Sequence, residues 1–234
     1  MSKISLSSNP SGNGIFTIAS PNSNTNRTLT LPDATGTVNV SGLANEVPAG
    51  SAGAPAIYPT GDTNTGIFFP AADTIAFAEG GVESMRIDSA GRVTMPLQPA
   101  FGAYSTAVMG GGASGVFAVF NTVYLNRGSS YNASNGRFTA PVTGVYQINF
   151  QGISTNSAGG APPYSPIHIE LWVNGVQVTG TSPYSQSSPS YDSLTMAVVV
   201  PMNAGDYANI RIEQGYLYGD NANVHNNFSG HLIG

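Results

Sequence analysis

Two short groups of polar residues have the side-chain types that metal binding or acid–base chemistry requires. His168 and Glu170 lie two residues apart in a segment of alternating polarity, so an extended strand would present both on one face. Because the chain has no Cys and no second His near this pair, a solvated or interface pair is the better interpretation. Asp220, Asn221 and Asn223 place side-chain oxygens in one loop, but they include a single carboxylate, so we expect no metal site.

Hydrolysis of a polysaccharide needs two carboxylates about 5 to 10 Å apart around a groove. The acidic residues of the second half are Glu170, Asp192, Asp206, Glu213 and Asp220, and no two of them form an evident pair in the sequence. The motifs of serine hydrolases, phosphate-binding loops and zinc proteases are absent, and the Gly-rich stretch 110–115 predicts only a flexible turn. We therefore expect a protein that is not an enzyme and has no cofactor, although two of these carboxylates could still meet in space.

Tyrosines surrounded by short neutral residues are the best binding candidates. They are Tyr164, Tyr184, Tyr191, Tyr216 and Tyr218. Flat amphipathic rings beside Ser, Pro, Asn and Gln suit the recognition of sugars or adaptable protein contacts. The same tyrosines could equally seal an interface between copies of the chain. Trp172 lies opposite the apolar face of its segment, and Trp172 and His168 are the candidates for that interface.

The low charge of the chain excludes several classes of partner. The 234 residues include 7 Lys and Arg and 12 Asp and Glu, which gives a net charge of −5. So few basic residues leave no cationic surface for nucleic acid or for an anionic membrane. The longest apolar run, near residues 194–202, is much shorter than a membrane span, so we expect no membrane insertion. A hydrophobic content of 41% still favours a folded β-rich protein.

The aromatic residues divide the chain near a Pro-rich hinge at 96–99. Before this hinge the aromatic residues are Phe16, Tyr58, Phe68, Phe69 and Phe77. So few bulky side chains cannot build a core for the first part, which we expect to fold against copies of itself. We predict a docking segment over 1–14, a β-rich shaft over 15–96 with a linker or collar near 42–61, and a knob over 97–234.

The second part alternates apolar and polar residues with a period of two. Tyr146, Ile148 and Phe150 share one face of a predicted strand, and Ile210 and Ile212 share one face of another. Turn signals such as Asn-Gly recur every 8 to 15 residues, and no window supports a long amphipathic helix. This spacing predicts an all-β fold, either a sandwich or a jelly roll.

An ordered series of motifs in this second part adds to that prediction. The motifs include FNTV at 120–123, NGRFTAP at 135–141, LWVNG at 171–175 and FSGHL at 228–232. The series, which covers about 115 residues, resembles the complement C1q-like globular domain. The resemblance implies a ten-stranded jelly roll that forms compact homotrimers, in the superfamily shared with tumour necrosis factor.

The first part contains phrases of a different kind. They are SPNSNTNRTLTLPDATGT at 20–37, GDTNTGIFFP at 61–70 and MRID at 85–88. These phrases resemble stalk segments of tailed-bacteriophage fibre proteins, especially of marine and cyanobacterial phages. The resemblance implies a virion protein with a shaft and a trimeric knob, which agrees with a first part that has no core of its own.

From the sequence we therefore expect a homotrimeric phage tail fibre whose N-terminal segment docks on a tail, baseplate or capsid protein. Its knob would bind a glycan or protein on the host surface, with avidity from repeated weak contacts. A structural head fibre or capsid decoration without receptor binding is the alternative. A glycan depolymerase is a third interpretation.

Overall fold

The structure, a computed structural model, describes residues 11–15, 17, 22–26, 28, 47–112, 115–155, 167–182, 192–220 and 222–234. The chain divides into two compact units, Met1–Glu46 and Val47–Gly234, and the strands of the described residues lie in the second unit. Over the described ranges the secondary structure is strand and turn, with no helix. Accordingly, no helical segment in these ranges has the length and apolar character needed to cross a bilayer.

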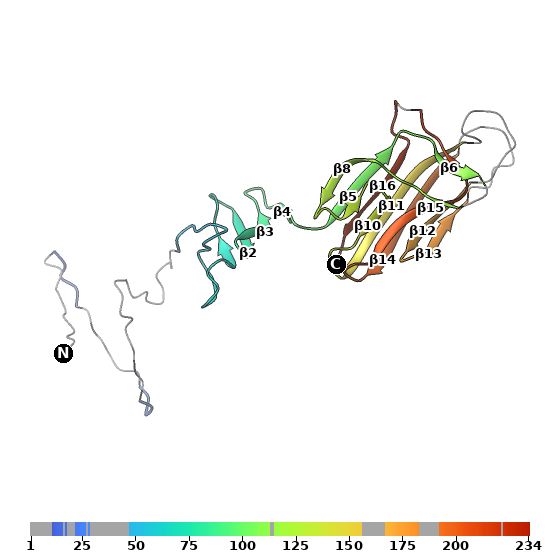
Figure 1. Cartoon of the computed structure of the whole chain (residues 1–234). Helices are drawn as coiled ribbons and strands as arrows, with labels where there is room; N and C mark the ends of the chain where they lie inside the picture. Colours follow the sequence, from blue (N-terminus) through green and yellow to red (C-terminus); the bar gives the residue numbers. More distant parts are fainter. Residues whose placement is uncertain are drawn as a thin grey trace. The chain divides into compact units, whose positions relative to one another are not determined.

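A small antiparallel sheet of four strands comes first, and its strands neighbour one another in chain order (Figure 1). The strands are β1 (Gly66–Phe68), β2 (Ile75–Glu79), β3 (Val82–Ile87) and β4 (Val93–Thr94). Glu79 pairs with Val82, and the two glycines between them both have positive φ, as the tight turn of a two-residue hairpin requires. The buried core of this sheet is small and consists of Phe68, Ala76 and Ala78.

These strands occupy only part of the predicted shaft. The segment predicted as a collar, near 42–61, has no strand in its described part and only isolated bridges, Ser51 with Ala54 and Ile57 with Ile67. Most of residues 16–46 and all of 1–10 lie outside the described residues. The docking segment and the shaft therefore stay predictions.

The second part forms the two layers of a jelly roll (Figure 1). The first layer runs in the order β14 (Ser193–Met202), β11 (Gly144–Thr155), β16 (Asn226–Leu232), β5 (Ala100–Ser105) and β8 (Thr122–Arg127). The second layer contains β13 (Val176–Thr181), β12 (His168–Val173) and β15 (Tyr207–Leu217), with the short strands β7 (Val116–Phe117), β10 (Arg137–Thr139) and β9 (Tyr131–Asn132). At one end β15 also pairs with β11 and with β6 (Met109–Gly112), which joins the two layers there.

The predicted alternation places one face of each long strand between the layers. Tyr146, Ile148 and Phe150 of β11 are buried, as the sequence indicates. Ile210 and Ile212 of β15 are buried in the same way, and Arg211 between them faces outward. The all-β prediction is therefore confirmed for the described residues.

Aromatic rings from both layers meet in the core. Phe101 of β5 stacks on Phe138 of β10 with ring centroids 4.6 Å apart, and on Tyr131 of β9 at 5.2 Å. The ring of Phe228 meets Phe101 edge-on at 4.9 Å. Aromatic pairs in these geometries stabilise a core beyond the area that they bury, so this cluster holds the two layers together.

The structure corrects two expectations about the knob. Its described residues form twelve strands rather than ten, because the Gly-rich region adds β6 and β7 beside β15. Gly110 is thus part of a strand and not of a flexible turn. It pairs with Tyr216 and has a φ of 129°, and a Cβ there would lie 2.4 Å from the carbonyl oxygen of Gly215. Only glycine permits so close an approach.

Tyr131 makes the stability of this core sensitive to alkaline pH. Its hydroxyl donates a hydrogen bond to the carbonyl oxygen of Phe120 at 3.0 Å, and burial raises its pKa from 10.0 to about 12. The unfolded chain loses this proton near pH 10, so the free energy of unfolding falls as the pH rises from 10 towards 12. We expect urea unfolding at several pH values to show this fall, and Tyr131→Phe to reduce it.

At neutral pH the Tyr131→Phe variant should lose about 1 kcal/mol, the net value of one hydrogen bond. Tyr58→Phe is the control, because Tyr58 is 53% exposed. If both variants change with pH as the wild type does, burial of the Tyr131 hydroxyl is not the cause of the alkaline destabilisation.

Candidate binding site

Two segments of the knob that the sequence predicts as loops are flanked by described residues at one end of the layers, which we call the loop end. The segments are residues 156–166 and 183–191, and both lie outside the described residues. The described residues beside the two segments, which we call their roots, are hydrogen-bonded to each other. The backbone N–H of Ser154 donates to the carbonyl of Asp192 at 2.8 Å. The N–H of Asp192 donates in return to Ser154 Oγ at 2.9 Å. Ile167, at the end of the first segment, packs against Gly215, where a Cβ would lie 3.1 Å from Ile167 Cα.

Two of the five predicted binding tyrosines lie at the loop end. Tyr216 pairs with Thr155 on one side and with Gly110 on the other. The N–H of Tyr218 donates to the carbonyl of Ile153 at 2.7 Å, and both tyrosine side chains are half-buried. The other three, Tyr164, Tyr184 and Tyr191, fall outside the described residues. The structure thus brings together the roots of their loops and the two described tyrosines.

Asp220 closes the turn that follows these tyrosines. Its Oδ1 accepts hydrogen bonds from the N–H groups of Ala222 (2.9 Å) and Asn223 (2.7 Å), and its Oδ2 accepts one from Asn223 Nδ2 (2.7 Å). His225 Nε2 lies 3.2 Å from the same Oδ2, and its ring contacts Tyr218 at 5.0 Å between centroids. The hydrogen bonds from Asn223 are the main cause of a pKa of Asp220 well below its ordinary value of 3.8.

This bonding leaves little of the Asp220 carboxylate for an ion. Both oxygens are engaged inside the loop, and Asn221, another of the three oxygen-bearing residues considered for a metal, lies outside the described residues. No three His, Cys, Asp or Glu side chains gather closely enough to hold a metal in the part of the chain that the structure describes. The described hydrogen bonds therefore account for both carboxylate oxygens by the conformation of the loop.

Trp172 is at the centre of a cluster on the outward face of the second layer. Its Nε1–H donates to Glu170 Oε2 at 2.7 Å, and the ring of Phe117 meets it edge-on with centroids 6.1 Å apart. The guanidinium carbon of Arg211 lies 4.7 Å from the indole centroid, a cation–π geometry. One ring face and the N–H group are thus already occupied, which makes Trp172 poorly suited to stack on a sugar.

His168 and Arg211 lie beside the buried carboxylate of Glu170, which is 5% exposed. His168 Nε2 lies 3.6 Å from Oε1, so the two residues share a face as the sequence predicts. Arg211 lies 3.7 Å from Oε2 and forms a shorter ion pair of 2.8 Å with Glu213. A carboxylate held by these partners belongs to a structural network, because an unpaired charge would be costly at this depth. Contact of Trp172 or His168 with another copy stays a prediction.

Of the five acidic residues considered for glycan hydrolysis, Glu170 and Glu213 come together, bridged by Arg211. Asp206 caps a turn, as its Ala-Gly-Asp context indicates. It accepts hydrogen bonds from Asn174 Nδ2 and from the N–H of Asn203, both at 2.7 Å, and these lower its pKa. The shared arginine explains the Glu170–Glu213 pair without a catalytic role.

The sequence motifs do not predict that Phe117 and Gly115 belong to the cluster around Trp172. A Cβ on Gly115 would lie 2.3 Å from Arg211 Nη2 and from Glu213 Oε2, so the glycine backbone packs directly on the ion pair. Phe117 reaches Trp172 because β7 pairs with β15 at Arg211. The one signal in the sequence was the outward position of Arg211 in an alternating strand.

The depressed pKa of Asp220 gives a test of the loop. A group whose folded pKa is lowered adds stability above its unfolded value of 3.8 and loses it only as the pH falls towards the folded pKa. We expect a ¹³C NMR titration of the carboxyl carbons to place the Asp220 midpoint below 3.8, with Asp220→Asn identifying the signal. The variant should also speed hydrogen exchange at the Asn223 amide at neutral pH. A midpoint at or above 3.8 would contradict the described bonding.

Comparison with known proteins gives a consistent family match. Residues 100–233 match the family model of the C1q domain. Caprin-2 of Danio rerio is 26% identical over 137 residues, which cover 58% of this chain and 14% of that protein. Complement C1q tumor necrosis factor-related protein 6 of Rattus norvegicus is 27% identical over 119 residues, which cover 49% of this chain and 42% of that protein. The match thus spans less than half the length of either relative.

Two solved structures are similar at lower identity. The globular domain of zebrafish complement 1qA protein is 18% identical with a TM-score of 0.43, covering 58% of this chain and 98% of that chain. Murine APRIL is 12% identical with a TM-score of 0.41, covering 58% of this chain and 99% of that chain. The family match over more than half of the sequence, on a jelly roll of two layers, shows that the chain belongs to the C1q domain family.

Proposed function

We propose that this chain is a non-enzymatic homotrimeric bacteriophage fibre protein whose C1q domain binds a glycan or protein on the host cell surface. C1q domains typically form homotrimers, which supports the assembly. The resemblance of residues 20–37 and 61–70 to phage fibre stalks supports placement on a virion, with the N-terminal segment docked on a tail, baseplate or capsid protein.

The observation that carries the binding proposal is the common origin of both tyrosine-bearing loops at the loop end. Ser154 and Asp192 fasten their roots together, and Tyr216 and Tyr218 lie beside these roots. A trimer presents three such ends, and a virion many more, so weak contacts with neutral groups add up to avidity. A surface with few charges also makes the contact insensitive to salt.

The trimer contact that the structure favours is the outward face of the first layer. The strands β14, β11, β16 and β5 contain no Asp, Glu, Lys or Arg, whereas the outward face of the second layer carries Glu170, Arg211 and Glu213. On the uncharged face Val199 is 55% exposed, and Gln147 Nε2 donates to Asn149 Oδ1 at 3.0 Å. Interfaces are depleted of charge at their centre. We therefore place the contact here and not around Trp172 and His168.

Substitution of two exposed valines tests whether the trimer contact lies on the first layer or on the second. In one copy Val199 of β14 is 55% exposed and Val178 of β13 is 44% exposed, so each should tolerate lysine in a monomer. We expect Val199→Lys to dissociate the trimer of 24.0 kDa chains in sedimentation velocity, because a buried unpaired ammonium is costly. Val178→Lys should sediment as the wild type does. Dissociation by Val178→Lys alone would move the interface to the second layer.

A cell-binding assay tests recognition itself. Full-length trimer is incubated with intact cells of a panel of marine cyanobacterial strains, and the bound fraction is measured by fluorescence. On a strain that binds, Tyr184→Ala and Tyr191→Ala should each weaken binding by about tenfold or more, as loss of an aromatic contact repeated in three copies does. Tyr58→Ala, which removes an exposed ring outside the knob, is the control. A trimer that binds no strain would instead favour a structural capsid decoration.

A further inference from the structure

One face of the small sheet is apolar and only partly covered by the described residues. Cross-strand pairing places Ile67 opposite Phe77, Phe77 opposite Met85, Ile75 opposite Ile87 and Ile87 opposite Val93, so these side chains share one face. We call it the open apolar face, and its residues are Ile67, Ile75, Phe77, Met85, Ile87 and Val93. None of the six is buried, and Ile75 and Val93 are 41% and 54% exposed. The other four residues are half-buried, so the face runs across all four strands with only part of its surface covered.

The opposite face of the same sheet is already packed. Phe68 and the alanines of β2 are buried there against Ala52. The ion pair of Glu83 and Arg86 lies on that side as well, because these residues pair with Ala78 and Ala76. A sheet facing water would carry its charges on the water side. Here the open apolar face has none among its six residues, and Glu79 stands at its rim beside the β2–β3 turn.

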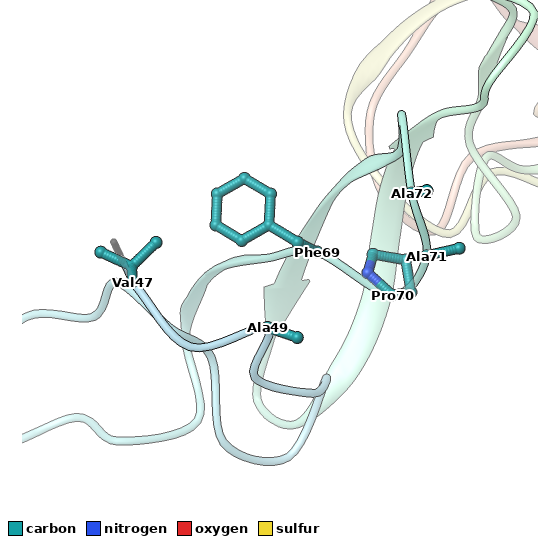
Figure 2. A pocket seen from close by; sticks show the side chains of 6 residues that line it. All are labelled: Val47, Ala49, Phe69, Pro70, Ala71 and Ala72. Atoms are coloured by element: carbon teal, nitrogen blue, oxygen red, sulfur yellow. The ribbon is translucent and has the colours of Figure 1, made fainter. Parts of the chain in front are cut away.

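Apolar surface continues beyond the end of β1. Figure 2 shows Val47 and the ring of Phe69 on the border of an open pocket that Pro70 and three alanines also line. Val47 is 44% exposed. Large apolar patches left in water mark sites of contact with a partner. The buried core of the small sheet has only three residues, Phe68, Ala76 and Ala78, so the sheet buries little apolar surface of its own.

We propose that the open apolar face is covered by the same face of two further copies of this chain, which makes the small sheet a second trimer contact. This inference rests on the homotrimer of the proposed function. Gln98 Nε2 donates to the carbonyl of Leu232 at 3.2 Å, and the N–H of Leu232 donates to the carbonyl of Pro99 at 3.0 Å. The connection from Thr94 to Gln98 therefore spans at most about 14 Å, at about 3.3–3.6 Å per residue.

The short connection from Thr94 to Gln98 favours other copies of this chain as the cover of the open apolar face. Once three C1q domains associate, each small sheet is held within a short reach of its own domain, and its effective concentration towards the other two is high. Three sheets with one apolar face each can turn these faces towards a common axis, so that every copy covers the other two. A second protein would have to compete with this intramolecular association.

Neighbouring residues of β4 provide the test, and the wild-type chain contains no Cys. Val93 and Thr94 are both exposed in one copy, but alternation along the strand puts Thr94 on the opposite face. We expect Val93→Cys in the native protein to react with a maleimide reagent at least about tenfold more slowly than Thr94→Cys, as burial between copies protects it. Ile75→Cys should be protected in the same way. In urea all three should react at equal rates.

Sedimentation of each variant separates the two possible failures. A trimer in which Val93→Cys and Ile75→Cys react as fast as Thr94→Cys would overturn this inference alone, since the face would then be open to solvent or to another partner. A monomeric wild type would overturn the homotrimer, and with it the proposed function. Slow labelling of both cysteines in a trimer is the result expected.

Discussion

The packing of Phe101 against aromatic rings of both layers is the interaction on which the C1q domain depends. Phe138 and Tyr131 contact it from the second layer, and Phe228 contacts it from the first. Because each long strand turns alternate residues towards this cluster, its remaining residues are committed to the two outward faces. The chemistry of those outward faces then differs sharply: one layer is uncharged along four strands, and the other carries the network of Glu170, Arg211 and Glu213.

Alternation along a strand is local, and this is why much of the fold could be predicted. Residues such as Tyr146, Ile148 and Phe150 identify their own buried face without knowledge of any neighbour. The strand β6 could not be predicted in this way, because glycines have no side-chain pattern and the segment becomes a strand only by pairing with β15. The register of β1 to β4 is also non-local, and a bulge between Phe77 and Ala78 interrupts the simple alternation.

The residue types of the candidate site could be predicted from the sequence, but the contacts between those residues could not. Sequence reasoning picked Tyr216, Tyr218 and Asp220 for their types, yet it could not tell that Asp220 is bound within its own loop. Similarly, Trp172 was placed correctly on an outward face, while its partners Phe117 and Arg211 come from strands far away in the sequence. Such contacts depend on which strands become neighbours, and a single sequence carries little information about this.

The place of β11 in the first layer has a mechanical consequence. This strand is flanked by β14 and β16 along most of its length, and it ends at Thr155. A pull on β11 from that end is directed along the strand axis, at right angles to the hydrogen bonds that hold β11. Under such shear the hydrogen bonds of β11 bear the load together and do not open one by one. A force applied along this strand is therefore resisted far better than a force that peels an edge strand away from the sheet.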